Sequence, residues 1–330
     1  MTQPPRYSVL VPVFNEEAVI PECHRRLREV MDAHGEPYEL VFIDDGSRDA
    51  SGEQLRALAA ADPRVRVISF ARNFGHQVAI SAGMDRAAGQ AVVVIDADLQ
   101  DPPAVIPQMI ARWKEGWEVV YGRRVQRQGE TGFKKVTAFL FYRLLRRLTD
   151  VEIPTDVGDF RLIDRKVCDV MASLRERNRF VRGLIAWIGF RQTAVEYVRE
   201  ARFAGETKYP LSKMLRFAID AVIGFSYRPL RLAIHLGLLS ALAGFGYLVY
   251  VLYLALFTDR TVAGWASLIV LNLLFNGIVL AILGILGEYV GRIHEEAKGR
   301  PYYVVRETLG FPAPPGGENA AGRSPGRTGS

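Results

Sequence analysis

The chain has 330 residues, which suits one large domain with additional segments, and it carries a net charge of +6 at neutral pH. A positive balance favours phosphate-rich partners, such as anionic lipid, a phosphorylated substrate or nucleic acid. The 2 cysteines cannot build a disulfide framework, and because the N-terminus has no apolar signal core, we expect that the first domain is not exported by a cleaved signal.

The N-terminal part of the chain alternates between short apolar runs and amphipathic stretches. We expect strands at residues 7–14, 38–43, 65–70 and 91–95, and helices at residues 15–31, 51–61 and 77–88. Strands that alternate with helices are typical of a parallel sheet with helices on both faces. The sequence therefore predicts an α/β fold in which ligands collect at the carboxyl ends of the strands.

Acidic residues follow three of the predicted strands. They are Glu16 after the first, Asp44 and Asp45 after the second, and Asp96 and Asp98 after the fourth. Residues two apart in extended backbone face the same way, so Asp96 and Asp98 can act together. Two carboxylates, or one carboxylate with the Gln100 amide, can hold a divalent ion whose remaining ligands are substrate phosphates. Alone this pattern is weak, because aspartate pairs also terminate strands and cap turns.

Two basic amphipathic stretches come next, at residues 133–148 and 211–225. Basic residues lie beside a broad apolar face in the first stretch: Lys134, Lys135, Arg143, Arg146 and Arg147. A helix of this kind next to a membrane anchor is expected to lie in the membrane interface. The alternative is a surface helix that packs on its own domain.

Residues 232–257 and 263–287 are two long apolar runs separated by a short connector. Because a membrane-spanning helix needs about 20 apolar residues, both runs qualify, and together they predict a transmembrane hairpin. Basic residues flank the outer ends of the pair: Arg228, Arg231, Arg292, Lys298 and Arg300. The positive-inside bias predicts a multi-pass protein of the cell (inner) membrane whose catalytic domain and both termini are cytoplasmic. The tail at residues 312–330 is rich in Pro and Gly and is expected to be disordered.

Motifs at the strand ends resemble those of glycosyltransferase family 2, whose nucleotide-binding domain has the GT-A (Rossmann-like) fold. They are Pro12 to Glu16, Asp44 to Ser47 and Asp96 to Asp98. The similarity continues through residues 96–103, 122–124, 158–162 and 202–209. These segments look like the polyprenyl-phosphate hexosyltransferases, which include dolichol-phosphate mannose synthases and bacterial undecaprenyl-phosphate glucosyltransferases. The resemblance spans residues 7–305, including the hairpin.

The resemblance and the apolar pattern together divide the chain into successive parts. They are a nucleotide-sugar-binding GT-A core (1–130), an acceptor-side part of the catalytic domain with interfacial helices (131–231), the transmembrane hairpin (232–291), a cytoplasmic C-terminal segment (292–311) and the disordered tail (312–330).

The resemblance also implies roles for individual residues. Donor-binding residues would be Pro12, Phe14, Glu16, Asp44, Asp96, Ala97, Arg202 and Lys208. Asp98 and Gln100 would hold Mg²⁺ or Mn²⁺. The acceptor phosphate would meet Arg124, with help from Lys134, Lys135 or Arg143, and the catalytic residues would be Asp98, Arg124 and Asp159. His76 would shape the donor pocket, and Phe14 stands where many relatives carry Tyr.

The chemistry of such a transfer agrees with these residue types. A phosphate monoester has a second pKa of about 6, so the acceptor is largely ionised at neutral pH and needs no strong general base. It needs cations that overcome the repulsion between two phosphate groups, and arginine supplies them as fork-shaped donors. The family resemblance implies inversion at the anomeric carbon.

We therefore expect transfer of a hexose, with glucose from UDP-glucose as the leading candidate, to a polyprenyl (undecaprenyl or dolichyl) phosphate. GDP-mannose or another UDP-sugar is an alternative donor. Two other classes remain: a processive polysaccharide synthase, for which two spans are few, and a non-catalytic membrane scaffold or lipid-sugar transport partner. We expect the bilayer and a homo-oligomer, for example a tetramer, as partners. Nucleic-acid binding would explain the charge but not the hairpin.

Overall fold

The computed structural model describes residues 4–125, 157–174, 176–177, 179–200, 228–257 and 264–311. The expected interfacial helices at 133–148 and 211–225, the connector between the two spans and the expected disordered tail lie outside the described residues.

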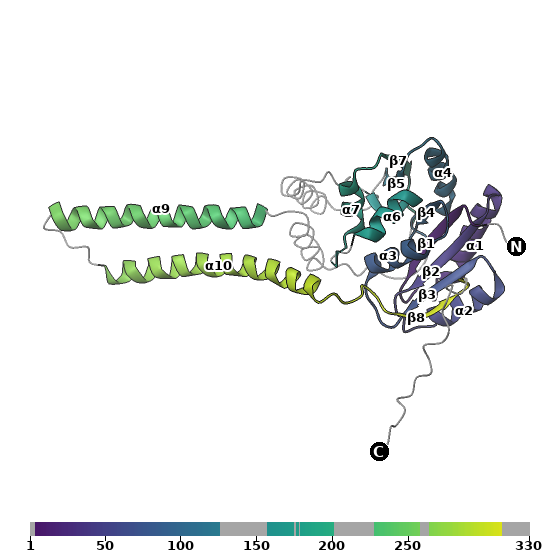
Figure 1. The fold of residues 1–330 in the computed structure, drawn as a ribbon, viewed down its shortest axis with the longest axis horizontal. Helices are drawn as coiled ribbons and strands as arrows, with labels where there is room; N and C mark the ends of the chain where they lie inside the picture. Colours follow the sequence, from purple (N-terminus) through teal and green to yellow (C-terminus); the bar gives the residue numbers. More distant parts are fainter. Residues whose placement is uncertain are drawn as a thin grey trace, which may run out of the picture.

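A mixed sheet forms the centre of the body (Figure 1), and within the described residues it has 8 strands in the order β7-β5-β6-β4-β1-β2-β3-β8. The strands are β1 (Tyr7–Val13), β2 (Tyr38–Asp44), β3 (Val65–Phe70), β4 (Ala91–Val94), β5 (Val119–Arg124), β6 (Val157–Asp164), β7 (Gln192–Tyr197) and β8 (Val305–Leu309). The first four confirm the strands expected from the apolar runs. Each is buried along nearly its whole length, as strands covered on both faces should be.

The alternating pattern alone predicts a fully parallel sheet, but the sheet in the structure is mixed. Strands β1 to β4 pair in parallel, whereas β6 runs antiparallel to β4 and β5, and β8 runs antiparallel to β3. The alternation of expected strands and helices ends at residue 95, before β6 and β8 begin. The reversal matters for the site, because the amino end of β6 lies beside the carboxyl end of β4, where Val94 is opposite Arg161.

Helices cover both faces of the sheet (Figure 1), as expected. One core contains the buried sides of α1 (Ile20–His34), α2 (Ser51–Ala61) and α4 (Ile106–Lys114), which follows the short 3-10 helix η1 (Pro103–Val105). The other core contains those of α3 (His76–Arg86), α6 (Arg165–Ser173) and α7 (Val181–Ile188).

Helix α1 begins later than the sequence indicated. We expected helix from residue 15, but Asn15 has a positive φ of 55°, a left-handed conformation that a helix cannot continue through. The helix starts at Ile20, with a proline in its first turn, where a missing N–H costs nothing. It ends at His34 and is followed by the cap residue Gly35, whose φ of 78° suits glycine.

Helices α9 (Arg228–Phe257) and α10 (Trp265–Ala297) lie side by side and project away from the body (Figure 1). Within them, Ala233–Leu254 and Leu271–Ala297 are long and apolar enough to cross a membrane, with mean hydropathies of 1.8 and 2.0. None of either window is buried inside the protein, unlike the core helix of a soluble domain. The start of α9 and the end of α10 both face the body.

The segment after α10 returns to the sheet, which the sequence did not reveal. Strand β8 adds to the outer edge of β3, and the backbone N–H of Ala71 donates to the carbonyl of Val304 at 2.9 Å. The Tyr303 ring stacks on Phe70 with 5.1 Å between centroids. At the start of the segment, the Arg177 side chain donates to the carbonyl of Arg300, and the backbone N–H of Arg177 donates to Glu296 near the end of α10 at 2.6 Å. Both ends of the segment therefore contact the body.

Candidate active site

The carboxyl ends of β1 and β2 are joined by side-chain hydrogen bonds. The backbone N–H of Asn15 donates to the Ser47 hydroxyl at 3.0 Å, and the Asn15 side chain accepts from the N–H of Arg48 at 2.9 Å. Asp44 is fully buried and accepts from the N–H of Ser47 at 2.9 Å. Phe14 next to this junction is 44% exposed, so an aromatic face is open to a ligand at this edge.

Asp45, the neighbour of Asp44, supports the loop that leads into α3. Its carboxylate accepts from the backbone N–H groups of Phe74 at 2.6 Å and Gly75 at 2.9 Å, and from the Asn73 amide at 2.9 Å. The two adjacent aspartates therefore have different structural roles. Asp45 holds the loop that places His76 at the start of α3, whereas Asp44 closes the turn after β2.

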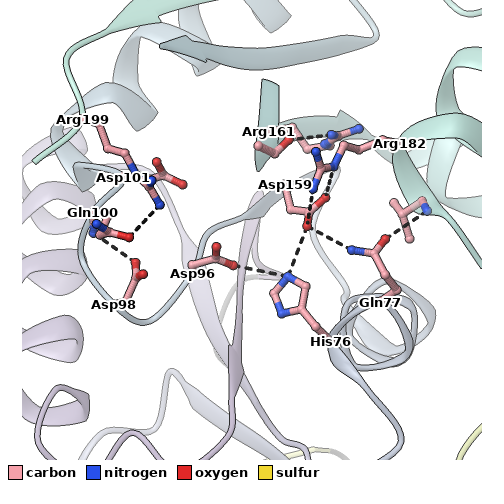
Figure 2. Close-up of polar contacts among 12 residues, drawn as sticks. His76, Gln77, Asp96, Asp98, Gln100, Asp101, Asp159, Arg161, Arg182 and Arg199 are labelled. Carbon is pink, nitrogen blue, oxygen red and sulfur yellow. Dashed lines mark hydrogen bonds and ion pairs between the residues drawn. The ribbon is translucent and has the colours of Figure 1, made fainter. Parts of the chain in front are cut away.

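After β4 the chain turns so that Asp98 and Gln100 come together. Leu99 has a positive φ of 57°, and the N–H of Gln100 donates to Oδ1 of Asp98 at 3.1 Å. The side-chain carbonyl of Gln100 accepts from Arg199 at 2.6 Å, and its backbone carbonyl accepts from the N–H of Glu200 at 3.0 Å. Figure 2 shows this loop, which we call the Asp98 loop (residues 96–101), beside Arg199.

The oxygen atoms of the Asp98 loop fit a hard divalent cation. Asp98 is 8% exposed, and the Asp98 carboxylate and Gln100 amide are the ligand types that Mg²⁺ and Mn²⁺ prefer. No group of three or more His, Cys, Asp or Glu side chains in the described part of the chain is placed to hold a metal by itself. A site with two protein ligands suits an ion whose other ligands are substrate phosphates and water.

A second cluster lies on the opposite side of Asp96 (Figure 2) and is centred on Asp159 from β6. Nε2 of His76 lies 3.3 Å from Asp159 and 3.4 Å from Asp96. Arg182 of α7 donates from Nε to Asp159 at 2.9 Å, and Gln77 donates to the same carboxylate at 3.0 Å. His76 therefore links a carboxylate at the end of β4 to one at the start of β6.

The charges of this cluster shift the pKa values of its members. Burial alone would lower the pKa of His76, but the hydrogen bond with Asp159 and the charge of Asp96 raise it to about 9. Burial opposes the charge of Asp159, yet the hydrogen bond with His76 and the charge of Arg182 lower the pKa of that carboxyl far below its usual value. Burial raises the pKa of Asp96 to about 6, against the charge of His76. At neutral pH, His76 is a cation between two carboxylates.

Arg124, the last residue of β5, lies in a third group of contacts. Its Nε donates to the Tyr197 hydroxyl at 3.1 Å, and its Nη2 lies 3.4 Å from Asp101. Burial would lower the pKa of Arg124, but the charge of Asp101 raises it above its ordinary value. Asp101 belongs to the Asp98 loop, so the loop and Arg124 are in direct contact.

Comparisons with known proteins show the family of the chain. The sequence model described as "Glycosyl transferase family 2" matches residues 8–171. The chain is 61% identical over 306 residues to the uncharacterized glycosyltransferase YkcC of Bacillus subtilis (strain 168), covering 93% of this chain and 95% of the relative. It is 41% identical over 303 residues to the bactoprenol glucosyl transferase of Shigella phage SfII, covering 92% and 98%.

The chain belongs to glycosyl transferase family 2. It is accordingly a glycosyltransferase. A solved structure of glucosyl-3-phosphoglycerate synthase from Mycobacterium tuberculosis, in complex with Mn²⁺ and UDP-glucose, resembles the chain with a TM-score of 0.43 and 23% identity, covering 67% of this chain and 77% of that one.

Within this family 2 chain, the structure brings several of the expected site residues to one edge of the sheet. Asp96, Asp98, Gln100, Arg124 and Asp159 all lie at the carboxyl ends of β4 and β5 or the amino end of β6. Their roles as donor, metal, acceptor or catalytic residues remain predictions.

Other expected residues lie differently. Pro12 is buried within β1 opposite Ile43, and Ala97 is 3% exposed; like Asp44 they are buried, and their roles as donor-binding residues remain predictions. Glu16 is partly exposed just beyond β1. The remaining expected contacts lie outside the described residues: Lys134, Lys135, Arg143, Arg202 and Lys208.

Sequence reasoning gave no role to four side chains that the structure places at the site: Asp101, Arg182, Tyr197 and Arg199. Asp101 is part of the quoted motif, so its proximity to Asp98 was a usable signal. The other three come from α7 and the end of β7, which carry no local pattern that points to this edge.

Proposed function

We propose that the chain transfers a hexosyl residue from a nucleotide-sugar, with UDP-glucose as the leading donor, to the phosphate of a polyprenyl carrier at a membrane. The observation that carries the proposal is the direct contact between Arg124 and Asp101 of the Asp98 loop. It brings a cation suited to an acceptor phosphate next to oxygen ligands suited to a donor-bound metal. Relatives with the printed name bactoprenol glucosyl transferase, matching over nine-tenths of this chain, support this acceptor and sugar.

On the donor side, Asp98 and Gln100 would hold Mg²⁺ or Mn²⁺, and Phe14, Glu16, Asp44 and Asp96 would surround the nucleoside. A bound ion supplies charge stabilisation for the departing nucleoside diphosphate. The Gln100 carbonyl now accepts from Arg199, so this contact would be exchanged when Gln100 holds an ion. Arg202 and Lys208 would add cations over the diphosphate.

On the acceptor side, Arg124 would neutralise the phosphate, with help from Lys134, Lys135 or Arg143. Asp159 would orient the acceptor or the sugar hydroxyls instead of accepting a proton. Its carboxylate is already engaged by Arg182, Gln77 and His76, and its lowered pKa makes it a weak base. A largely ionised phosphate acceptor needs no strong base.

The two apolar helices support a location at the membrane, where the lipid acceptor resides. We propose that α9 and α10 form a transmembrane hairpin in the cell (inner) membrane, with the catalytic domain in the cytoplasm. The basic residues at the outer ends of the pair support this orientation. A homo-oligomer, for example a tetramer, is part of the same proposal.

The test uses purified protein in detergent with undecaprenyl phosphate, Mg²⁺ or Mn²⁺, and a panel of radiolabelled nucleotide-sugars. We expect label in the organic phase from one donor, lost with EDTA and lowered at least a hundredfold by Asp98→Ala, since charge stabilisation of the leaving group is lost. Asp169→Ala is the matched control, because Asp169 is an exposed carboxylate of α6 whose ion pair is with Arg165 at 4.0 Å.

The outcomes separate the alternatives. Label from GDP-mannose or another UDP-sugar would support transfer to the lipid acceptor but would replace glucose by another sugar in the proposal. Absence of label from every donor, in protein shown to be folded, would contradict the lipid-acceptor proposal and favour a glycan acceptor or a non-catalytic scaffold. Transfer that survives both EDTA and Asp98→Ala would refute the metal assignment.

A further inference from the structure

The contacts of Arg124 form a closed triangle with two buried side chains. The Tyr197 hydroxyl donates to the Asp101 carboxylate and accepts from Nε of Arg124 at 3.1 Å, while Nη2 of Arg124 lies 3.4 Å from Asp101. Asp101 is 1% exposed and Tyr197 is 5% exposed. The Arg124 side chain is 22% exposed. The cation therefore reaches the surface of the site, whereas its two supports do not.

The Tyr197 ring is fixed by its place in the sheet. Tyr197 ends β7 directly opposite Arg124 in the parallel pair of β5 and β7, and its carbonyl accepts from the N–H of Val125 at 3.1 Å. The ring packs edge-to-face on Phe160 with 5.7 Å between centroids. A Cβ at Gly122 would stand 2.7 Å from the Tyr197 ring, so glycine at this position leaves the space that the ring occupies. The hydroxyl is thus held at one position beside Arg124.

The opposite side of Arg124 is bounded by Gly158 of β6. A Cβ at Gly158 would lie 2.8 Å from Nη2 of Arg124, closer than a real contact allows. The guanidinium therefore lies between a glycine on one side and the Tyr197–Asp101 pair on the other. Hydrogen bonds between buried neutral donors and ionised groups are stronger and more directional than those in water.

The same pair connects Arg124 to the expected metal ligands. Asp101 lies in the Asp98 loop, and two residues after Tyr197 the side chain of Arg199 donates to Gln100 at 2.6 Å. The next residue, Glu200, donates its backbone N–H to the Gln100 carbonyl at 3.0 Å. The end of β7 therefore contacts the Asp98 loop at three successive points, through Tyr197, Arg199 and Glu200.

We propose that Tyr197 and Asp101 are positioning residues that orient the Arg124 guanidinium toward the acceptor phosphate and tie it to the Asp98 loop. This inference rests on the proposed function, since it assumes that Arg124 meets the acceptor. Neither residue touches the reacting atoms. Their effect passes through the direction in which the Arg124 guanidinium faces.

The main test is Tyr197→Phe, which deletes one hydroxyl and keeps the ring that packs on Phe160. Loss of a hydrogen bond to a charged group predicts an increase of about tenfold in the KM for undecaprenyl phosphate. The KM for the nucleotide-sugar should stay unchanged. The matched control is Tyr38→Phe, because Tyr38 is also buried, donates to Asp32 at 2.7 Å and has Arg64 over its ring, but lies at the amino end of β2.

Both substitutions remove a buried hydroxyl from a carboxylate, so both should lower the Tm slightly and to a similar degree. Only Tyr197→Phe should change the acceptor KM. An equal rise in both KM values, or a Tyr38→Phe variant with the same kinetic defect, would show a general structural role and overturn the proposal.

A double-substitution cycle tests whether Tyr197 acts through Arg124. In an Arg124→Ala background, Tyr197→Phe should cost nothing further, because the group that it orients is gone. A full additional tenfold loss in that background would contradict the proposal. Gly158→Ala gives a second route, since its Cβ displaces Arg124 without removing the hydroxyl, and it should raise the acceptor KM in the same way.

Failure of this inference differs from failure of the proposed function. Wild-type protein that makes no lipid-linked sugar from any donor would reject the function itself. Active wild-type protein whose acceptor KM is unchanged by Tyr197→Phe, Asp101→Asn and Gly158→Ala would reject only the positioning role.

Discussion

His76 is placed to act as a fixed cation between two carboxylates of the site. Its Nε2 lies 3.4 Å from Asp96 and 3.3 Å from Asp159, and the charges of Arg182 and Arg161 also act on Asp159. Since these partners raise its pKa to about 9, His76 contributes stability that is fully present below its unfolded pKa of about 6.5 and is lost as the pH rises through about 9.

Replacing His76 by Gln should therefore make the free energy of unfolding depend less on pH in the alkaline range. Gln keeps an N–H that can reach the carboxylates but does not titrate. The wild-type free energy of unfolding should fall by about 1 kcal/mol more than that of His76→Gln between pH 6.5 and 9.5, a small figure because 42% of the His76 side-chain surface is exposed and solvent screens its charge. Thermal melts of detergent-solubilised protein across this range measure the difference.

The control for this prediction is His34→Gln, since His34 also pairs with a carboxylate, Glu36 at 2.9 Å, but lies beyond the amino end of β2. Parallel pH curves for the wild type and His76→Gln would contradict the prediction. His76→Ala, which leaves both carboxylates without this partner, should also reduce kcat/KM by about tenfold if Asp96 and Asp159 must keep their orientation.

The individual site residues show how far the sequence alone could reach. Asp96, Asp98 and Gln100 were predictable because an apolar strand delivers them to a known edge of the sheet. Tyr197 and Arg182 were not, because their positions depend on how β7 and α7 pack, and long-range pairing leaves no local pattern. The role of Asp45 as a loop support was equally hidden, since it became visible only through the three groups that donate to it.

At the scale of elements, the parts with strong periodicity were predicted well. The four parallel strands and three helices of the N-terminal half agree with the structure except at the start of α1, where a left-handed Asn15 delays the helix. The elements of the catalytic domain after residue 95 were missed: strands β5, β6, β7 and β8 and helices α4, α6 and α7. Strand β8 is short, exposed at alternate residues and joined to the sheet only because the chain returns from α10, so its composition alone resembles a linker.

Strand β8 and Tyr303 form an attachment between α10 and the catalytic domain. Tyr303 stacks on Phe70 and donates its hydroxyl to Asp85 at 3.2 Å, next to the backbone pairing of β8 with β3. Tyr303→Ala removes the partly buried ring and its hydrogen bond. We expect a loss of about 2 kcal/mol in the stability of the catalytic domain, below the range for a fully buried aromatic residue.

This loss should appear as a lower Tm and as faster proteolysis within residues 298–311, because the freed segment exposes its backbone. Val304→Ala is the control, since the Val304 side chain is 48% exposed and the substitution keeps the neighbouring backbone contacts. Unchanged melting and unchanged cleavage in Tyr303→Ala would show that β8 pairing alone holds the segment.

For the whole molecule, the arrangement of the helices makes orientation testable. The start of α9 and the end of α10 both face the body (Figure 1), so a hairpin would place the connector between them on the far side of the bilayer from the catalytic domain. Both native cysteines, Cys23 and Cys168, are buried, and burial raises the pKa of each thiol to about 12, which makes them unreactive toward maleimides.

An added cysteine can therefore report orientation in the full chain. With a membrane-impermeant maleimide on intact cells, Thr261→Cys in the connector should be labelled, whereas Lys298→Cys just beyond α10 should be labelled only after the membrane is opened. Unsubstituted protein is the control for background from the native thiols. The opposite pattern would place the catalytic domain outside. Labelling of both positions in intact cells would contradict a hairpin that crosses the membrane, and the proposal that this hairpin holds the site at the bilayer of the lipid acceptor would then fall.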